Sequence, residues 1–152
     1  MEKIILDKKG ILEYQQNRSP YLMIDFATEI IPGKSAKGYK DLNNDEWFFK
    51  VHWPKDPNMP GMLQVEALVQ MCALSILCLP GNKGKVMYLT SANNLKFIDL
   101  IKSGNYNKTT IFGILRSLQI PEITKYFYFA QSVVTYDINF RYLTFCKFYV
   151  TS

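Results

Sequence analysis

Two residues of this chain have the types and the placement that proton-transfer chemistry requires. His52, the only histidine of the sequence, opens a loop with prolines at every third position, and Glu66 follows in a segment with almost no other charge. Each has an ordinary structural explanation alone, since a lone histidine is usually a hydrogen-bonded structural group and a glutamate near a helix start favours the helix dipole. A carboxyl group inside an apolar segment, however, needs a specific partner or a proton. An imidazole and a carboxyl group in one pocket would be suited to general acid–base catalysis.

The segment that carries Glu66 is expected to be a long buried helix over about residues 61–79. It contains only four polar side chains after Gly61, and Pro60-Gly61 and Pro80-Gly81 flank it as start and stop signals. A membrane span is disfavoured, because Glu66 and two glutamines would lie within the bilayer. A helix that is apolar on nearly every side and lies outside a membrane must run through the core of its own domain.

Segments rich in strand formers lie on both sides of this helix. Extended segments are expected at 21–26, 36–42, 47–51, 86–89, 109–118, 126–136 and 140–150, and a short amphipathic helix at 8–16. Pro32-Gly33-Lys34 predicts a turn, and Asp137-Ile138-Asn139 predicts a hairpin. No linker or repeat divides the chain. We therefore expect one α+β domain over residues 1–152, with an antiparallel sheet of five to seven strands wrapped around the long helix.

Composition excludes several classes of protein. Hydrophobic residues make up 48% of the 152 positions, which is too many for a disordered chain. The net charge of +5 is scattered and does not indicate nucleic-acid binding. Cys72, Cys78 and Cys146 follow no ligand spacing and only one histidine is present, so no metal site is expected. Unpatterned cysteines, and an N-terminus without the apolar run of a signal peptide, favour a cytoplasmic location.

The loop and the start of the long helix resemble a family signature. The run from His52 to Gln70, HWPKDPNMPGMLQVEALVQ, resembles the pattern H-F-P-x-x-P-x-M-P-G-V-L-x-x-E-A-x-A-Q of the β-hydroxyacyl-(acyl carrier protein) dehydratases. Upstream, the run NRSPYLMID from Asn17 to Asp25 is similar to the family's H-R-x-P-F-L-L-V-D segment, with Asn17 in place of its first residue. Downstream, Asn94-Leu95-Lys96-Phe97 is similar to the A-K-F-R strand. The resemblance covers about residues 11–105.

The resemblance implies a hotdog fold, in which an antiparallel sheet curls around one long helix. Members of the family form dimers whose sheets join edge to edge, and often trimers of such dimers. The active site would lie at the dimer interface, with His52 from one subunit and Glu66 from the other. The implied reaction removes water from a β-hydroxyacyl thioester on acyl carrier protein and yields the trans-2-enoyl thioester. The resemblance implies no cofactor besides the carrier's 4'-phosphopantetheine.

When the family's reaction is applied to this sequence, several residues of the signature receive a role. Neutral His52 would remove the α-proton, and Glu66 would donate a proton to the departing hydroxyl group. The backbone N–H groups of Gly61 and Met62 would stabilise the developing enolate oxygen at the helix start. Gln70, one turn after Glu66, would either orient the carboxyl group or serve only in packing or in the dimer contact.

The sequence departs from the family pattern around the histidine. Val51 stands where a glycine usually precedes it, and Lys55-Asp56 replaces a Gly-His pair in the loop. Lys55 is the candidate for contact with an acidic carrier protein. Ser103-Gly104-Asn105 replaces a P-G-D turn, and the C-terminal third matches no motif of the family. These departures predict a specialised member, from a secondary-metabolite or surface-polymer pathway, more than a housekeeping fatty-acid enzyme.

Two other functions stay open from the sequence. One is a hotdog thioesterase in which Glu66 activates water, and the other is a non-catalytic hotdog module that binds acyl groups or a partner protein. The presence of both His52 and Glu66 favours the dehydratase over either alternative.

Overall fold

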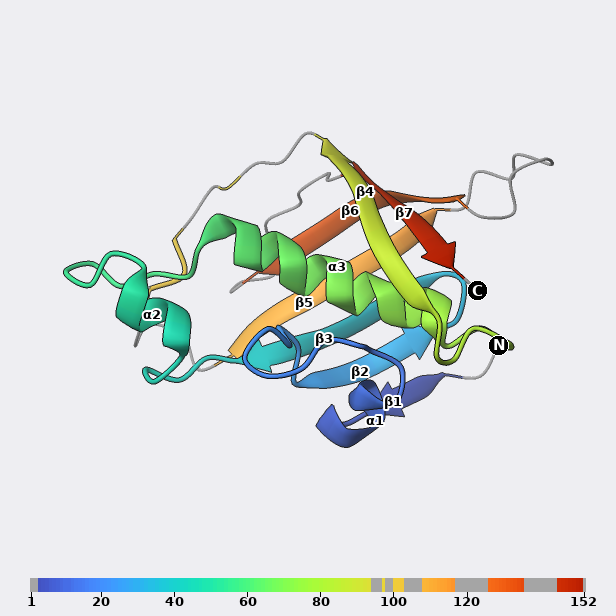
Figure 1. Cartoon of the computed structure of the whole chain (residues 1–152), viewed down its shortest axis with the longest axis horizontal. Helices are drawn as coiled ribbons and strands as arrows, with labels where there is room; N and C mark the ends of the chain where they lie inside the picture. The colour runs from blue at the N-terminus through green and yellow to red at the C-terminus, as the bar shows by residue number, and fades with distance from the viewer. Residues whose placement is uncertain are drawn as a thin grey trace.

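The computed structural model describes residues 3–93, 97, 100–102, 108–116, 126–135 and 145–151. In this part of the chain an antiparallel sheet of seven strands, in the order β1-β2-β3-β5-β6-β7-β4, lies against one long helix (Figure 1). The strands are β1 (Ile4–Leu6), β2 (Phe26–Ile31), β3 (Ser35–Asp41), β4 (Val86–Asn93), β5 (Lys108–Arg116), β6 (Tyr126–Thr135) and β7 (Phe145–Thr151). The helices are α1 (Lys8–Leu12), α2 (Trp47–Val51) and α3 (Gly61–Leu77).

The long helix α3 runs through the core, as its apolar sequence predicts. Pro60 is the N-cap residue of α3. The helix ends at Leu77, with Cys78 as its C-cap residue shortly before Pro80, close to the expected bounds of 61–79. It lies closest to β3 and β5, and β4 crosses its other side (Figure 1). At Gly38 in β3, an added Cβ would overlap the backbone carbonyl oxygen of Phe26 on β2 and the end of the Met71 side chain on α3. Glycine is therefore needed for the close approach of β3 to the backbone of β2, on the face where Met71 packs.

The aromatic segment 47–51 is a helix, so its prediction as a strand is wrong. Phe48 and Phe49 are both buried although they are adjacent, and their rings lie 4.7 Å apart at 66°. In a strand, successive side chains would point to opposite faces of the sheet. A short helix places both rings in the core, and this packing overrides the strand preference of aromatic residues.

The prediction of a strand at 21–26 is also wrong over most of its length, because β2 begins only at Phe26. Leu22, Met23 and Ile24 are buried in succession. A half-buried strand would alternate, whereas a loop can direct all three side chains inward. The Arg18 carbonyl accepts from the N–H groups of Tyr21 and Leu22, which forms a turn before the loop.

The first helix is shorter than the expected 8–16. The Ile11 carbonyl still accepts from the N–H groups of Tyr14 and Gln15. The Arg18 guanidinium donates to the carbonyl oxygens of Leu12, the last helical residue, and of Gln15, at 3.4 and 2.6 Å. Asp7 caps the other end by accepting from Gly10 N–H at 2.8 Å. The turn at 32–34 and the strands β3 to β7 lie where the sequence predicts them, with shifted ends, and the expected hairpin at 137–139 lies outside the described residues.

None of the helices in the described ranges is long and apolar enough to cross a membrane.

Candidate active site

His52 is held at the C-terminal end of α2 by a bond to the backbone. It is the C-cap residue of that helix, and its Nδ1 lies 2.9 Å from the carbonyl oxygen of Asn58. A carbonyl oxygen can only accept, so Nδ1 carries the proton in this contact. In the neutral imidazole, Nε2 is then the unprotonated nitrogen. Nε2 is therefore the atom of His52 that can take up a proton.

The proline loop, residues 53–60, begins with an unusual backbone conformation. Trp53 has φ 54°, in the left-handed region that residues other than glycine rarely adopt. Its ring stacks on the imidazole of His52, with the centroids 5.3 Å apart and the planes at 26°. Such conformations cost on the order of 1–3 kcal/mol and gather at functional sites. The stacked ring covers one face of His52.

Three further contacts fix the proline loop. The amide of Asn58, which is only 2% exposed, donates to the carbonyl oxygen of Asp56 at 2.8 Å. The Met59 N–H donates to the carbonyl oxygen of Ile101 at 2.8 Å. Lys102 forms an ion pair with Asp56 at 2.7 Å. Because Asn58 supplies the acceptor for His52, these contacts also hold the imidazole in place.

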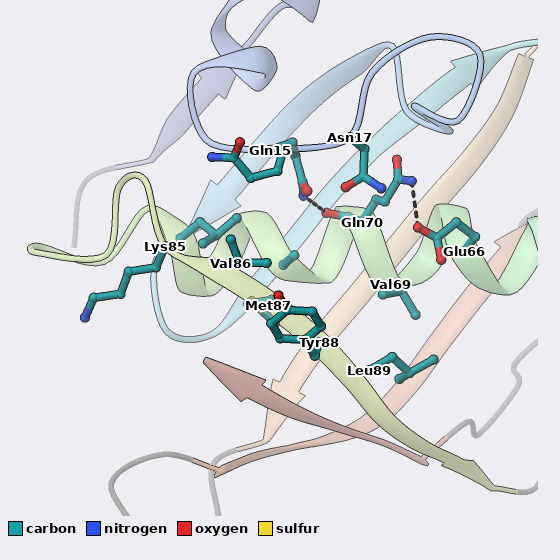
Figure 2. A pocket seen from close by; sticks show the side chains of 13 residues that line it. Gln15, Asn17, Glu66, Val69, Gln70, Lys85, Val86, Met87, Tyr88 and Leu89 are labelled. Carbon is teal, nitrogen blue, oxygen red and sulfur yellow. Dashed lines mark hydrogen bonds between the residues drawn. The ribbon is translucent and has the colours of Figure 1, made fainter. Parts of the chain in front are cut away.

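Glu66 is held by Gln70, one turn further along α3 (Figure 2). Nε2 of Gln70 donates to Oε1 of Glu66 at 2.8 Å and to the carbonyl oxygen of Tyr21 at 2.8 Å. Oε1 of Gln70 accepts from the N–H of Met23 at 2.7 Å. The Tyr21 carbonyl, which accepts, and the Met23 N–H, which donates, fix the positions of Nε2 and Oε1 in the Gln70 amide. Gln70 can therefore only donate to Glu66. The side chain of Gln70 is 2% exposed and has all its hydrogen-bonding groups paired.

The loop after α1 supports the same part of α3. Nε2 of Gln15 donates to the backbone carbonyl oxygen of Gln70 at 2.6 Å (Figure 2). Arg18 donates to the carbonyl oxygens of Gln15 and Asn17, at 2.6 and 2.9 Å, and thereby holds this loop. Asn17 lines the same cavity as Glu66, and Figure 2 shows it over the helix beside Gln70.

Tyr21 lies within electrostatic reach of Glu66. Burial raises the pKa of the Tyr21 phenol, and the nearby Glu66 carboxylate raises this pKa further. The backbone of the same residue accepts from Gln70. Tyr21 is thus linked to the Glu66 region through its backbone carbonyl and through the charge of Glu66.

A cavity of about 160 Å³ lies between α3 and β4, and Glu66 and Gln70 line one end of it (Figure 2). His52 is not among the residues that line this cavity. Within one chain, the candidate base and the candidate acid therefore do not both line this cavity.

The remaining predicted residues lie at the start of α3 and in the proline loop. The N–H groups of Gly61 and Met62 lie in the first turn of α3, where no intrahelical acceptor exists, and no acceptor for them occurs in the described part of the chain. A Cβ on Gly61 would lie 2.8 Å from the ring of Phe97, so glycine is needed for this close approach. Lys55 is exposed. No cluster of three or more His, Cys, Asp or Glu side chains suited to a metal ion occurs among the described residues.

The sequence did not single out Asn58, Gln15 or Tyr21 as parts of the site. Asn58 falls in the loop signature at a position where the family pattern allows any residue, so the pattern gave no reason to choose it. Its contribution is a backbone carbonyl, which no residue type reveals. Gln15 reaches α3 only through the tertiary fold, and it carries no signal in the sequence.

Comparisons with known proteins agree on one family. The model of the family described as "FabA-like domain" matches residues 16–112. The chain is 41% identical over 105 residues to a 3-hydroxyacyl-[acyl-carrier-protein] dehydratase FabZ of Clostridium novyi (strain NT), covering 67% of this chain and 74% of that protein. It is 41% identical over 111 residues to the protein of the same name from Clostridium botulinum (strain Hall), covering 73% and 76%.

A solved structure has the same fold. The match is to a chain of the dehydratase heterocomplex ApeI:P from Xenorhabdus doucetiae, with a TM-score of 0.70, 93% of this chain and 91% of that chain covered, and 10% sequence identity. At this identity the likeness concerns the fold alone. The prediction of a hotdog arrangement, with an antiparallel sheet and a helix, is confirmed.

Proposed function

The chain belongs to the FabA-like family, and on that premise we propose that it removes water from a 3-hydroxyacyl group carried on acyl carrier protein, with His52 as the base and Glu66 as the acid. This makes it a hydro-lyase. The observation that carries the assignment of roles is the bond from His52 Nδ1 to Asn58 O, because it leaves Nε2 free to accept a proton.

The reaction then needs two proton transfers. Nε2 of His52 takes the α-proton, the electron pair forms the new carbon–carbon double bond, and the bond from the β-carbon to its hydroxyl group breaks. Glu66 supplies a proton to that hydroxyl group, so water and the trans-2-enoyl thioester leave. The thioester oxygen gains negative charge on the way. The N–H groups of Gly61 and Met62 are placed at the positive end of the α3 dipole to stabilise it.

We propose that the two groups meet across a dimer, His52 of one subunit with Glu66 of the partner subunit. His52 of the same chain does not line the cavity beside Glu66, and this supports a site shared between subunits. Strand β4 ends the sheet and pairs only with β7 among the described strands. Its eight residues offer a longer free edge than the three of β1, and Tyr88 and Leu89 on it are 55% and 38% exposed. An exposed edge strand of this kind is suited to pair with a second copy.

The proposal also covers the carrier protein, the oligomeric state and the location of the protein in the cell. No cofactor is needed beyond the 4'-phosphopantetheine arm that carries the acyl group. The excess of five positive charges suits an acidic carrier, and Lys55 lies exposed in the proline loop. We propose one domain over residues 1–152, a dimer that can assemble into a trimer of dimers, and a cytoplasmic setting. A reducing compartment suits Cys72 and Cys78, which form no disulfide within the described part of the chain.

One assay separates dehydration from the other hotdog activities. Purified protein is given a 3-hydroxyacyl thioester, and the enoyl product and the free thiol are followed in parallel. Enoyl formation without thiol release supports the dehydratase. Thiol release would instead indicate a thioesterase, and neither product would indicate a binding module. As a matched check, the protein is given the enoyl thioester, and formation of the 3-hydroxyacyl thioester by addition of water is measured. This is the reverse reaction of the same equilibrium.

A further inference from the structure

Lys40 is a charged residue on the core-facing side of β3. Alternate residues of this strand, Ala36, Gly38 and Lys40, are buried, so the lysine shares the face of the sheet on which Met71 packs. It is only 5% exposed. A buried ion pair is often no more stabilising than well-packed apolar side chains of similar volume. The contacts of the ammonium group therefore indicate the role of Lys40 better than its burial does.

The ammonium group of Lys40 lies between two carboxylates from different segments. Its Nζ is 2.7 Å from Oε1 of Glu46 and 3.3 Å from Oδ2 of Asp25. Asp25 is also held by Lys8 at 2.6 Å and by the Asp41 N–H at 3.1 Å. In the described part of the chain, Lys40 is the only partner of the Glu46 carboxylate. Lys40 therefore connects Glu46 to an anchor that other contacts already fix.

Glu46 and His52 lie at opposite ends of α2. Glu46 is the N-cap residue and His52 the C-cap residue of this helix, which has five residues and so makes less than two turns. A displacement at its first turn is therefore passed on to its last. The bond from His52 Nδ1 to the Asn58 carbonyl oxygen, at 2.9 Å, requires α2 and the proline loop to stay in place. A shift of about 1 Å is enough to break a hydrogen bond of this length.

We propose that Lys40 is a positioning residue for the base. By holding Glu46, and with it α2, against β3, it keeps the proton of neutral His52 on Nδ1 and leaves Nε2 free to accept the α-proton. The inference rests on the proposed function. Because Lys40 acts through α2, its loss should lower kcat and change KM little.

The first test uses the fact that His52 is the only histidine, so NMR of isotope-labelled imidazole nitrogens reports this residue alone. With the ring neutral, the unchanged protein should carry the proton on Nδ1. Lys40→Met keeps a long side chain without the charge, and the share of Nδ1–H molecules should fall to about half or less, because the Asn58 carbonyl no longer selects one tautomer. In the same variant kcat should fall about 10–100-fold.

Two further variants accompany Lys40→Met, each with thermal unfolding to verify that it is folded. Glu46→Gln keeps the shape of its side chain and should change the tautomer and kcat in the same direction, so it decides the question if Lys40→Met does not fold. Lys8→Met is the matched control. It removes an exposed cation from Asp25 but leaves the pair of Lys40 and Glu46, so both readouts should stay as in the unchanged protein.

Mixed dimers show which catalytic group depends on Lys40. When one subunit carries Lys40→Met with Glu66→Gln and its partner carries His52→Ala, the complete site takes His52 from the subunit without Lys40. Its kcat should fall about tenfold or more against the same mixture with Lys40 intact. When Lys40→Met is combined with His52→Ala and the partner carries Glu66→Gln, the complete site takes His52 from the subunit with Lys40, and kcat should match its control.

The outcomes separate this inference from the proposed function. A folded Lys40→Met or Glu46→Gln protein with unchanged kcat and tautomer would overturn the inference and leave the dehydratase assignment intact. An equal loss in both mixed dimers would also overturn it, since the effect would then not be specific to the base. If the unchanged protein forms no enoyl product, the dehydratase assignment fails instead. The NMR measurement would still decide whether Lys40 positions His52.

Discussion

Nε2 of Gln70 donates a hydrogen bond to Oε1 of Glu66 at 2.8 Å, and two backbone contacts prevent the amide from turning over. Oε1 of Glu66 is therefore an acceptor in this arrangement. When Glu66 carries a proton, the proton lies on the other oxygen, Oε2, where it can be delivered. The buried amide of Gln70 therefore decides which oxygen of Glu66 can deliver a proton.

The first prediction concerns Gln70. Gln70→Met keeps the length of the side chain but leaves the Met23 N–H and the Tyr21 carbonyl without partners, each at a cost of about 1–3 kcal/mol. Loss of orientation of Glu66 should lower kcat about 10–100-fold with little change in KM. Steady-state kinetics and thermal unfolding measure both effects. Gln64→Met is the control, since Gln64 makes only a 3.3 Å contact. An unchanged kcat in a folded Gln70→Met protein would reduce Gln70 to a packing role.

The second prediction assigns unequal roles to the acid and the base. His52→Ala removes the only histidine and should lower dehydration about 10⁴-fold, the upper end for acid–base groups. Glu66→Gln keeps the shape and should leave more activity. A substrate with a better leaving group than hydroxide should restore the Glu66 variant and not the His52 variant, because only the acid assists departure. Rates of both variants on both substrates test this, and equal restoration would show the roles to be wrong.

The third prediction concerns the shared site. His52→Ala and Glu66→Gln proteins, each poorly active alone, should regain activity when their subunits are exchanged, because some interfaces then pair an intact His52 with an intact Glu66. The ratio of recovered to unchanged activity after verified exchange is the measurement. Mixing two preparations of the same variant provides the control. Absence of recovery would mean that both groups act within one chain.

The fourth prediction concerns an ion-pair network that joins the loop at 21–25 to β3. Asp25 pairs with Lys8 at 2.6 Å and with the buried Lys40 at 3.3 Å, and Lys40 also pairs with Glu46 at 2.7 Å. Burial by itself would raise the pKa of Asp25, but the two lysines outweigh burial and hold this pKa below its usual value. The stabilisation is therefore complete above the unfolded-state pKa of about 4 and is lost as the pH falls through the lower folded-state value.

Asp25→Asn should accordingly lower the free energy of unfolding at pH 7 by about 1–3 kcal/mol, because it leaves a buried lysine with one partner fewer. The difference from the unchanged protein should shrink as the pH falls below about 4. Urea unfolding across the pH range measures it. Glu13→Gln is the matched control: its pair with Lys83 is exposed, so its loss should have little effect. A difference that does not depend on pH would rule out a charge effect.

The fifth prediction concerns the carrier protein. Turnover of a carrier-bound substrate should fall as salt rises past roughly 0.15 M, where the screening length is about 8 Å. Turnover of the short pantetheine analogue should be less sensitive. Lys55→Glu should weaken the carrier-dependent reaction and leave the analogue's rate nearly unaffected. Identical salt responses for the two substrates would exclude recognition of the carrier by charge.

The sequence alone determined the local features of this protein. Pro60 precedes α3 and Pro80 follows its C-cap residue by two positions, because proline does not continue a regular helix. The spacing from His52 to Gln70 identified the family and the pair of residues proposed for the chemistry, and the i, i+4 relation of Glu66 and Gln70 follows from helical geometry. These inferences depend on short stretches of chain, in which residue type and spacing are sufficient.

Only the tertiary structure decided the features that depend on distant residues. The aromatic segment at 47–51 is a helix because the core accepts Phe48 and Phe49 together. The acceptor for His52 is a backbone carbonyl, and Gln15 reaches α3 across a separation of 55 residues. Strand β4 ends the sheet beside β7, and a cavity lies between β4 and α3. Burial and hydrogen bonding between segments that are far apart in the sequence override the local preference for helix or strand. These interactions stabilise the protein only in the folded structure, where the segments are in contact.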